Sequence, residues 1–482
     1  MKSLVLTRLS VAIAMLVWAG FGSRVEAQPG PNPVRVSETY ELANIILALT
    51  DYGKTDPWEV AQHSAYYKDV RAHFDPYAHH PLLTAVNYSR EKWESYLSFR
   101  TDAYAFTFDA NSRLVRAIDF HANKEFNPFE EQLNLIEDFV RTTGFRQFYR
   151  AHLPYYQRLA TAYLASQRYD EMRHFLENEF GKRSELTAYA IVFSPLVGRM
   201  NCHRTVAGVG TDFITLPDFL LDGRAVNKAT RAEIASSTHM LFTELDHAFV
   251  NPATAQHQAL LAANFTASRW DMSSGYGRDS VGVFNEYMTW AVYDLYVQTY
   301  FPDVAATVSQ DWALQNATRG FFASSAFNHE LTRLYKARRP GQRLNDLYPA
   351  FIRRLGALTS SLSQPTITHC NLDKQTIADT VATLIIRFSE PMMADTSLNL
   401  VRAVEQAGKV VRQERVALTP ATSDLRWTND GTMLQVQVRL VANAINHLVL
   451  NYPWRTRTAF RSRNGVDLKP YSRISTRVSA GN

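Results

Sequence analysis

Hydrophobic positions recur at helical spacing through most of the first 355 residues of this 482-residue chain. Apolar side chains three and four positions apart form one face of an amphipathic helix, and this spacing is found in 41–49, 129–139, 153–164, 169–180 and 344–355. Two short apolar runs, 103–108 and 188–193, are typical of strands. The pattern therefore predicts a mainly helical region with a few strands.

The pattern changes after residue 356, where the chain becomes small and polar in the manner of a linker. Further on, apolar and polar residues alternate through 434–440, directly after the turn-forming sequence Asn-Asp-Gly at 429–431. Short strands at close spacing favour a sandwich. We therefore expect a multi-domain protein with a mainly α domain over 28–356, a linker over 357–365 and an all-β sandwich over 366–482.

The start of the predicted β domain carries a motif. Residues 386–392 read Ile-Arg-Phe-Ser-Glu-Pro-Met, and Trp427 and Gly431 follow at the next expected turn. This segment resembles the "FSEPM" strand and turn of bacterial Ig-like domains. The resemblance implies an Ig-like sandwich that serves as a spacer or adhesive module and has no catalytic role of its own.

The N-terminus has the pattern of a secretory signal peptide. Lys2 and Arg8 give it a positive start, 9–21 is apolar, and 25–27 (Val-Glu-Ala) has the small-x-small form of a cleavage site. We expect residues 1–27 to be removed and the mature chain to be periplasmic or extracellular; an uncleaved anchor is the alternative. No cysteine is placed for lipid attachment, and no later run is long and apolar enough to span a membrane.

Composition narrows the class of protein. Hydrophobic residues make up 46% of the chain and charged residues 20%, as in a packed globular protein. The formal net charge is +5, but lysine and arginine form no runs, so nucleic-acid binding is not expected. Cys202 and Cys370 are the only cysteines, and either a disulfide or two free thiols is open.

Residues 243–247 read Thr-Glu-Leu-Asp-His, within an expected helix over 234–250 that should end before Pro252. In the intact motif His-Glu-x-x-His, two histidines one turn apart bind zinc and the glutamate activates water. Here Glu244 and His247 occupy the positions of the base and the second ligand, whereas Thr243 replaces the first ligand.

Two further groups are candidates for the same site. Glu286 stands on a helix that is apolar on nearly every side, and a buried carboxylate is costly unless it is paired or binds a metal. The loop 273–280 is small and rich in glycine, and it could bring Tyr276 or Arg278 over the site to stabilise an oxyanion. An ordinary connection between helices is the alternative for this loop.

The region 38–355 resembles an uncharacterised family of secreted bacterial zincin-like proteins, whose members tend to carry His-Glu-Phe-x-His-x-Phe-Val-Asn-Pro and then Asn-Glu-Tyr. Residues 244, 247 and 249–252 match the first motif, and 285–287 match the second. The resemblance implies a gluzincin-like metallopeptidase fold in which Glu286 would be the ligand from the second helix. Thr243 departs from the pattern, since a threonine hydroxyl is a poor zinc ligand.

Three interpretations of the site follow. Zinc or another divalent metal could be held by His247, Glu286 and a third group, with Asp246, Glu244 or a histidine such as His203 as candidates. Alternatively, the site is metal-free and Glu244 with His247 is a structural pair, or Glu244, Asp246 and His247 form a metal-free acid/base set.

Two functions are compatible with these interpretations. The first is a metallopeptidase-like protein that hydrolyses peptide bonds. The second is an inactive binding protein whose partner is a peptide, protein or glycan of the cell envelope, because aromatic residues are frequent enough, at 12%, to line a groove.

Overall fold

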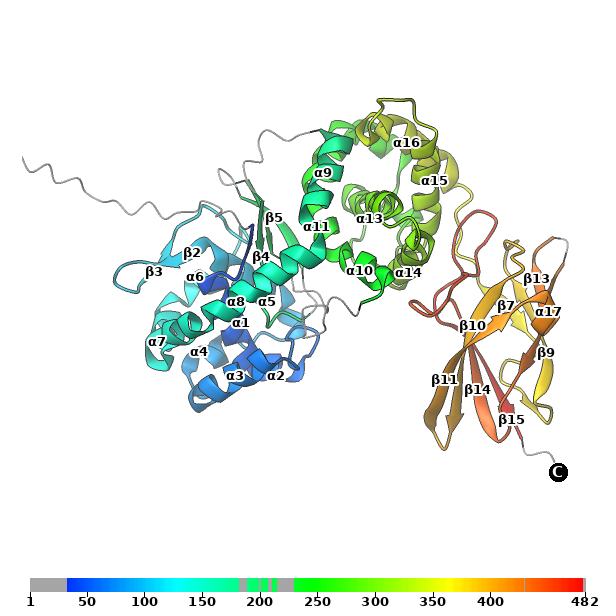
Figure 1. Cartoon of the computed structure of the whole chain (residues 1–482), viewed down its shortest axis with the longest axis horizontal. Coiled ribbons are helices and arrows are strands. Elements are labelled where there is room, and N and C mark those ends of the chain that lie inside the picture. Colours follow the sequence, from blue (N-terminus) through cyan, green and yellow to red (C-terminus); the bar gives the residue numbers. More distant parts are fainter. Residues whose placement is uncertain are drawn as a thin grey trace, which may run out of the picture.

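The computed structural model describes residues 33–181, 189–198, 201–206, 210–214, 229–428 and 430–479 (Figure 1). The predicted signal peptide, residues 1–27, lies outside this part of the chain. The described chain has a helical region followed by a region of antiparallel sheets, which confirms the predicted succession of a mainly α part and a β part. Helix α16 ends at Thr359 and strand β7 begins at Ile367.

The first part of the helical region packs around α1, whose twelve residues are almost all buried because apolar side chains occupy every face. Its helices are α1 (Glu38–Leu49), α2 (Asp51–Thr55), α3 (Ala65–Phe74), α4 (Pro81–Ala85), α5 (Trp93–Asp102), α6 (Pro128–Glu131), α7 (Leu133–Thr143), α8 (Phe145–Gln167) and α9 (Tyr169–Phe180). Helix α8 begins well before the predicted 153 and contains Pro154.

The second part of the helical region places one buried helix, α13, among the others (Figure 1). Fourteen residues of α13 are buried, as its apolar sequence predicts. The helices are α10 (Arg231–Ser237), α11 (His239–Gln256), α12 (Gln258–Asn264), α13 (Ser280–Tyr300), α14 (Ala305–Thr318), α15 (Ser324–Lys336) and α16 (Leu344–Thr359). One continuous hydrophobic core joins both parts.

A small mixed sheet lies beside α11. Its strand order is β1 (Val34–Arg35), β4 (Tyr189–Val192), β6 (Gly210–Ile214) and β5 (Cys202–Val206), with β5 antiparallel to β6 at one edge. Helix α11 contacts β5 and β6. A separate hairpin is formed by β2 (Phe106–Phe108) and β3 (Leu114–Arg116). The predicted run 188–193 contains β4, whereas only the second half of the run 103–108 is a strand, β2, because Ala103–Ala105 form a 3-10 helix.

The helix predicted over 234–250 is instead two helices. The chain breaks at Thr238, whose hydroxyl donates to the Ala235 carbonyl oxygen at 2.7 Å and competes with the helical pattern. Helix α11 then passes through Pro252 and ends at Gln256. Buried Ala253 and Thr254 hold this last turn against the core, and their packing outweighs the cost of an internal proline.

The C-terminal region consists of two sheets that enclose a second hydrophobic core. One sheet has the order β12 (Arg426–Trp427), β13 (Met433–Arg439), β9 (Val381–Phe388) and β7 (Ile367–Cys370). The other has the order β11 (Lys409–Leu418), β10 (Leu398–Gln406), β14 (Ala444–Leu450), β15 (Ser472–Val478) and β8 (Thr376–Ile377). A short helix, α17 (Pro420–Ser423), follows β11. The alternation in β13 is as predicted, with its apolar side chains buried.

The two regions are in contact. The Gln310 side chain of α14 donates to the Thr456 carbonyl oxygen at 2.8 Å and accepts from the Ala459 amide at 3.1 Å. The Ser325 hydroxyl of α15 donates to Asp467. Cys202 and Cys370 are both free thiols. No helix in the described part of the chain is both long enough and apolar enough to cross a membrane.

Candidate functional site

A cavity of about 400 Å³ lies where α11 and α13 meet the edge strand β5, the loop 271–279 and the end of α14. We call it the site cavity. Its lining combines acidic, basic, imidazole and aromatic side chains: Asn201, Cys202, His203, Arg204, His239, Met240, Thr243, Glu244, His247, Asn251, Tyr276, Glu286, Thr289, Trp290, Trp312 and Arg319. The sequence predicted that Glu244, His247, Glu286 and Tyr276 share one site, and the fold places them together.

Helix α11 presents one polar face to the site cavity. Thr243, Glu244 and His247 lie within about one turn of each other, so they project from neighbouring positions of the same helix. The other face of α11, with Leu241 and Leu245, is fully buried in the core. Burial of this apolar face fixes the rotation of α11 and with it the direction of the polar side chains.

His247 and Glu286 face each other across the two helices. The distance from His247 Nε2 to Glu286 Oε1 is 3.6 Å, and each side chain is 15% exposed. On its other side, His247 Nδ1 lies 3.2 Å from Asn251 Oδ1. Because an amide oxygen accepts a hydrogen bond, this contact favours a proton on Nδ1 and leaves the Nε2 lone pair directed at Glu286. A lone pair and a carboxylate at that separation call for a cation or a proton between them.

Glu244 is held beside this pair by the side-chain amide of Asn201, which donates to Glu244 Oε1. Burial raises the pKa of Glu244 to about 7, and the charge of Glu286 adds to the effect, whereas His247 and Arg204 oppose it. A carboxyl group with a pKa near neutrality can both accept and return a proton at physiological pH.

His203 contributes an imidazole from β5. Its ring centroid lies 6.0 Å from that of His247, with the two planes inclined by 30°. His203 was one of several alternatives for the third ligand, and its neighbours Cys202 and Arg204 also line the site cavity. The Thr243 hydroxyl donates to the Met240 carbonyl oxygen at 3.3 Å, within its own helix.

The loop 271–279 supplies Tyr276 to the site cavity. Burial raises the pKa of the Tyr276 hydroxyl, as do the charge of Glu286 and a hydrogen bond to it. This tyrosine therefore keeps its proton and can donate it to a neighbouring oxygen. Arg278, the other candidate from this loop, is exposed and does not line the cavity. The arginines that line it are Arg204 and Arg319, which sequence reasoning missed because no motif marks them.

Asp246, a candidate metal ligand, points away from the site cavity into the protein. It is fully buried, and neither carboxylate oxygen has a hydrogen-bond partner among the described residues. Burial holds its pKa well above the usual range, and the charges of Glu244 and Glu286 act in the same direction. Asp246 therefore lies on the core side of α11 and does not join the other candidate ligands in the site cavity.

The separation of the donor atoms can be compared with that of ligand atoms around a metal ion. Ligand atoms about 2.1 Å from a tetrahedral zinc ion lie roughly 3.4 Å from each other. The separation of 3.6 Å between His247 Nε2 and Glu286 Oε1 suits two ligands of one ion. In the described residues, however, no three His, Cys, Asp or Glu side chains converge closely enough to form a complete metal site. His203, with its ring centroid 6.0 Å from that of His247, is a further imidazole of the same cavity.

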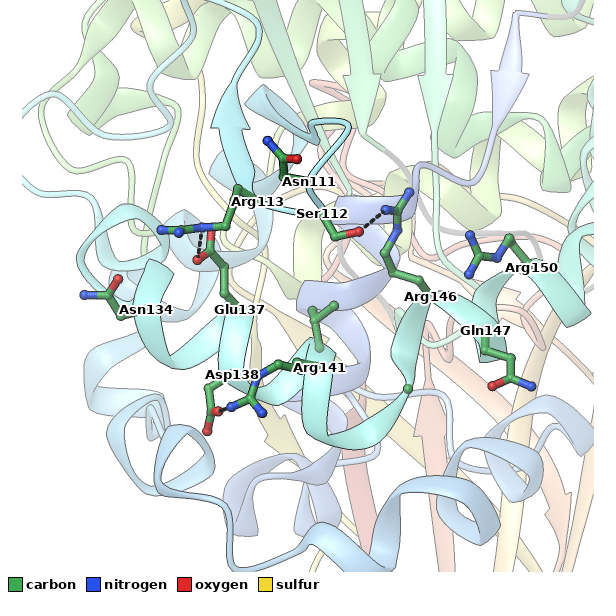
Figure 2. Close-up of a pocket in the computed structure, with 12 residues that line it drawn as sticks. Asn111, Ser112, Arg113, Asn134, Glu137, Asp138, Arg141, Arg146, Gln147 and Arg150 are labelled. Carbon is green, nitrogen blue, oxygen red and sulfur yellow. Dashed lines mark hydrogen bonds and ion pairs between the residues drawn. The ribbon is translucent and has the colours of Figure 1, made fainter.

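A larger cavity of about 650 Å³ lies elsewhere, between the β2–β3 turn and helices α7 and α8 (Figure 2). Four arginines and two carboxylates line it; Arg113 Nε lies 2.7 Å from Glu137, and Arg141 pairs with Asp138. It contains no histidine or cysteine. The site cavity, by contrast, is lined by Cys202, His203, His239 and His247.

Comparisons with known proteins add little. No protein-family profile matches the chain. No curated protein matches it either. A structure of the N-terminal part of the bacterial S-layer protein SbsC covers 51% of this chain and 58% of its own, at 8% identity and a TM-score of 0.17. A second, of the S-layer protein rSbsC(31-844), covers 67% and 46%, at 11% identity and the same TM-score of 0.17. The chain spans about half the length of these proteins, and such low scores carry no argument about fold or function.

Proposed function

We propose that this chain is a secreted, metal-dependent hydrolase of peptide bonds. The observation that carries the proposal is the 3.6 Å approach of His247 Nε2 to Glu286 Oε1 inside a cavity that also holds Glu244 and Tyr276. These four side chains are the types that a zincin uses as ligands, base and oxyanion donor.

His203 is the third metal ligand in this proposal. It replaces the histidine that Thr243 lacks, and its approach from the edge strand β5 brings it beside His247. His247 is already oriented by Asn251, in the way that a second hydrogen bond usually orients a metal-binding imidazole. His203, His247 and Glu286 together would give the three protein ligands of a catalytic zinc site.

The remaining side chains act on water and substrate. A divalent cation, when bound, supplies Lewis acidity and lowers the pKa of water. Glu244, oriented by Asn201, accepts the proton of the attacking water and later returns it to the leaving amine. Tyr276 donates a hydrogen bond to the carbonyl oxygen as negative charge develops there.

The C-terminal region is an Ig-like domain in this proposal, and the predicted signal peptide directs the protein to the periplasm or beyond. The FSEPM segment supports the first point. Phe388 packs on Trp427 at 5.8 Å between ring centroids, and the Met392 amide donates to the Gly431 carbonyl oxygen at 3.0 Å. The motif residues thus join a strand end to a turn of the same sheet.

The test is the metal content of the purified mature protein, measured by elemental mass spectrometry. We expect about one zinc ion per chain, lost in His247→Ala and Glu286→Gln and strongly reduced in His203→Ala. His329→Ala is the matched control, because this histidine is exposed on α15. Peptide libraries would then be screened with the zinc-loaded protein and with Glu244→Gln, which should bind zinc but not hydrolyse.

An inactive binding protein of the cell envelope is the second candidate. The observation that favours it is that no three donor side chains of the described residues converge on one point. In that case Asn201 and Asn251 satisfy Glu244 and His247 without a metal. Wild-type protein that takes up no metal after incubation with zinc would select this candidate and exclude the hydrolase.

A further inference from the structure

Two arginines line the site cavity. Arg204 lies on β5, and Arg319 directly follows α14. Within the described residues, neither guanidinium forms an ion pair with a carboxylate. Arg204 is half-buried, and Arg319 is exposed.

Arg319 is held in place by aromatic rings instead of a carboxylate. Its guanidinium lies 5.3 Å from the centroid of the Trp290 ring and 5.9 Å from that of Phe321. The Arg319 amide donates to the Asn316 carbonyl oxygen at 2.9 Å, which closes the end of α14. Stacking on aromatic faces fixes a guanidinium while leaving its N–H edges available for an anion.

Arg204 is oriented by a backbone contact. Its Nη1 donates to the His203 carbonyl oxygen at 2.7 Å, and its side chain lines the cavity. Arg204 and Arg319 line the same cavity as Glu244 and Tyr276, the groups assigned to base and oxyanion donor.

We propose that Arg204 and Arg319 bind a carboxylate of the substrate, so that the site takes short peptides with a carboxylate next to the bond to be cleaved. The inference rests on the proposed function, because it concerns the same cavity. A volume of about 400 Å³ suits a few peptide residues. The carboxylate has two sources, the free C-terminus of a peptide and an aspartate or glutamate side chain, and both offer the planar pair of oxygens that a guanidinium fork matches.

The experiment measures peptide binding to chelator-treated mature protein, so that neither metal uptake nor hydrolysis is needed. The probes are N-acetyl-Ala-Ala, its C-terminal amide, and N-acetyl-Asp-Ala-amide, followed by NMR line broadening and calorimetry. We expect at least one carboxylate-bearing probe to bind at least tenfold more tightly than the neutral amide. Preferential binding of N-acetyl-Ala-Ala alone would identify a terminal carboxylate as the ligand. Preferential binding of N-acetyl-Asp-Ala-amide alone would identify an acidic side chain.

Arg319→Gln and Arg204→Gln should each weaken binding of the preferred probe about tenfold. Arg319→Lys should restore part of the loss, since it keeps the charge but not the planar fork. Arg278→Gln is the matched control, because Arg278 is an exposed arginine of the neighbouring loop that does not line the cavity. Circular dichroism of each variant checks that it is folded.

Three results would overturn the proposal: equal binding of the neutral amide and both carboxylate-bearing probes, equal loss in Arg278→Gln and Arg319→Gln, or no binding of any probe at millimolar concentration. Displacement of the acid by inorganic phosphate at equal affinity would also count against peptide recognition and indicate a general anion site. None of these results depends on zinc, so carboxylate recognition and metal-dependent hydrolysis can fail independently.

Discussion

The indole ring of Trp454, in the C-terminal region, meets the indole ring of Trp312 edge-on, with ring centroids 5.0 Å apart and an interplanar angle of 86°. Trp312 in turn stacks on His239 at 3.5 Å, and both of these rings line the site cavity. The Trp454 amide also donates to Asp311, and its indole N–H donates to Gln315 at 3.3 Å. The β region is thus attached to the wall of the candidate site.

Trp454→Ala should loosen this wall. We expect a loss of about 1 to 2 kcal/mol in the free energy of unfolding, because an aromatic pair and one hydrogen bond disappear. Hydrogen exchange should accelerate in α14, measured by mass spectrometry of its peptides. Trp93→Ala is the control, because this exposed tryptophan contacts Glu59 in the first part of the helical region. Equal exchange of α14 in both variants would contradict the coupling.

Gly320→Ala should displace the loop that carries Tyr276. Gly320 has φ = +105°, and a Cβ atom there would lie 2.5 Å from the Ser274 amide nitrogen. Strain and overpacking together should lower the free energy of unfolding by roughly 2 to 5 kcal/mol. Gly341→Ala, measured by urea unfolding, separates backbone strain from overpacking, because Gly341 also has a positive φ of +82° but has open space around it. An equal decrease in the free energy of unfolding in both variants would show that the loop with Ser274 moves aside without an energetic cost.

Buried Glu41, which lies outside the site cavity, should make the free energy of unfolding depend on pH. It is fully buried on α1, its Oε1 accepts from the Tyr66 hydroxyl at 2.7 Å, and burial raises its pKa from 4.5 to about 7. Between pH 4.5 and pH 7 the unfolded chain releases the Glu41 proton, whereas the folded chain keeps it. The contribution of Glu41 to the free energy of unfolding is therefore fully present below pH 4.5 and declines as the pH rises to 7. The decline amounts to about 3 kcal/mol.

Glu41→Gln removes this titration. Relative to wild type, the variant should gain about 3 kcal/mol in the free energy of unfolding between pH 4.5 and pH 8, as measured by urea unfolding at both values. The quantity to compare is the difference in free energy of unfolding between variant and wild type at each pH, because the titration of all other groups cancels in that difference. A difference that does not vary with pH would mean that Glu41 does not titrate as proposed.

Asn251→Ala should weaken zinc binding about 10- to 100-fold without unfolding the protein, because it removes the hydrogen bond that orients His247. A competition assay with a chromogenic chelator gives the affinity. Asn178→Ala is a closely matched control, since Asn178 contacts His174 Nε2 at 2.9 Å on the exposed face of another helix. Unchanged affinity in Asn251→Ala would argue that His247 is not a ligand.

Thr243→His restores the complete His-Glu-x-x-His motif on α11. Thr243 already lines the site cavity, and a histidine one turn before His247 should raise zinc affinity at least tenfold. The same substitution should make His203 dispensable. Thr243→His combined with His203→Ala should therefore bind zinc fully, whereas zinc binding is strongly reduced in His203→Ala alone. Failure of the double variant to bind zinc would show that His203 does not stand in for the missing ligand.

The sequence by itself determined the local features of this protein. Helical periodicity located α1, α9 and α16, and the alternation of apolar and polar residues located β13, because both patterns depend only on which side chains are buried. The motif on α11 marked Glu244 and His247, and the resemblance to zincin-like proteins implied that Glu286 of α13 belongs to the same site.

Only the tertiary structure decided the rest of the site. Arg204 and Arg319 come from β5 and the end of α14, and nothing in their local sequence signals a cavity. Packing also overruled local preference where α11 passes through Pro252, and it turned Asp246 away from Glu286 and into the core. These outcomes depend on contacts between segments far apart in the chain, whose free energies exceed the small preferences that a local sequence expresses.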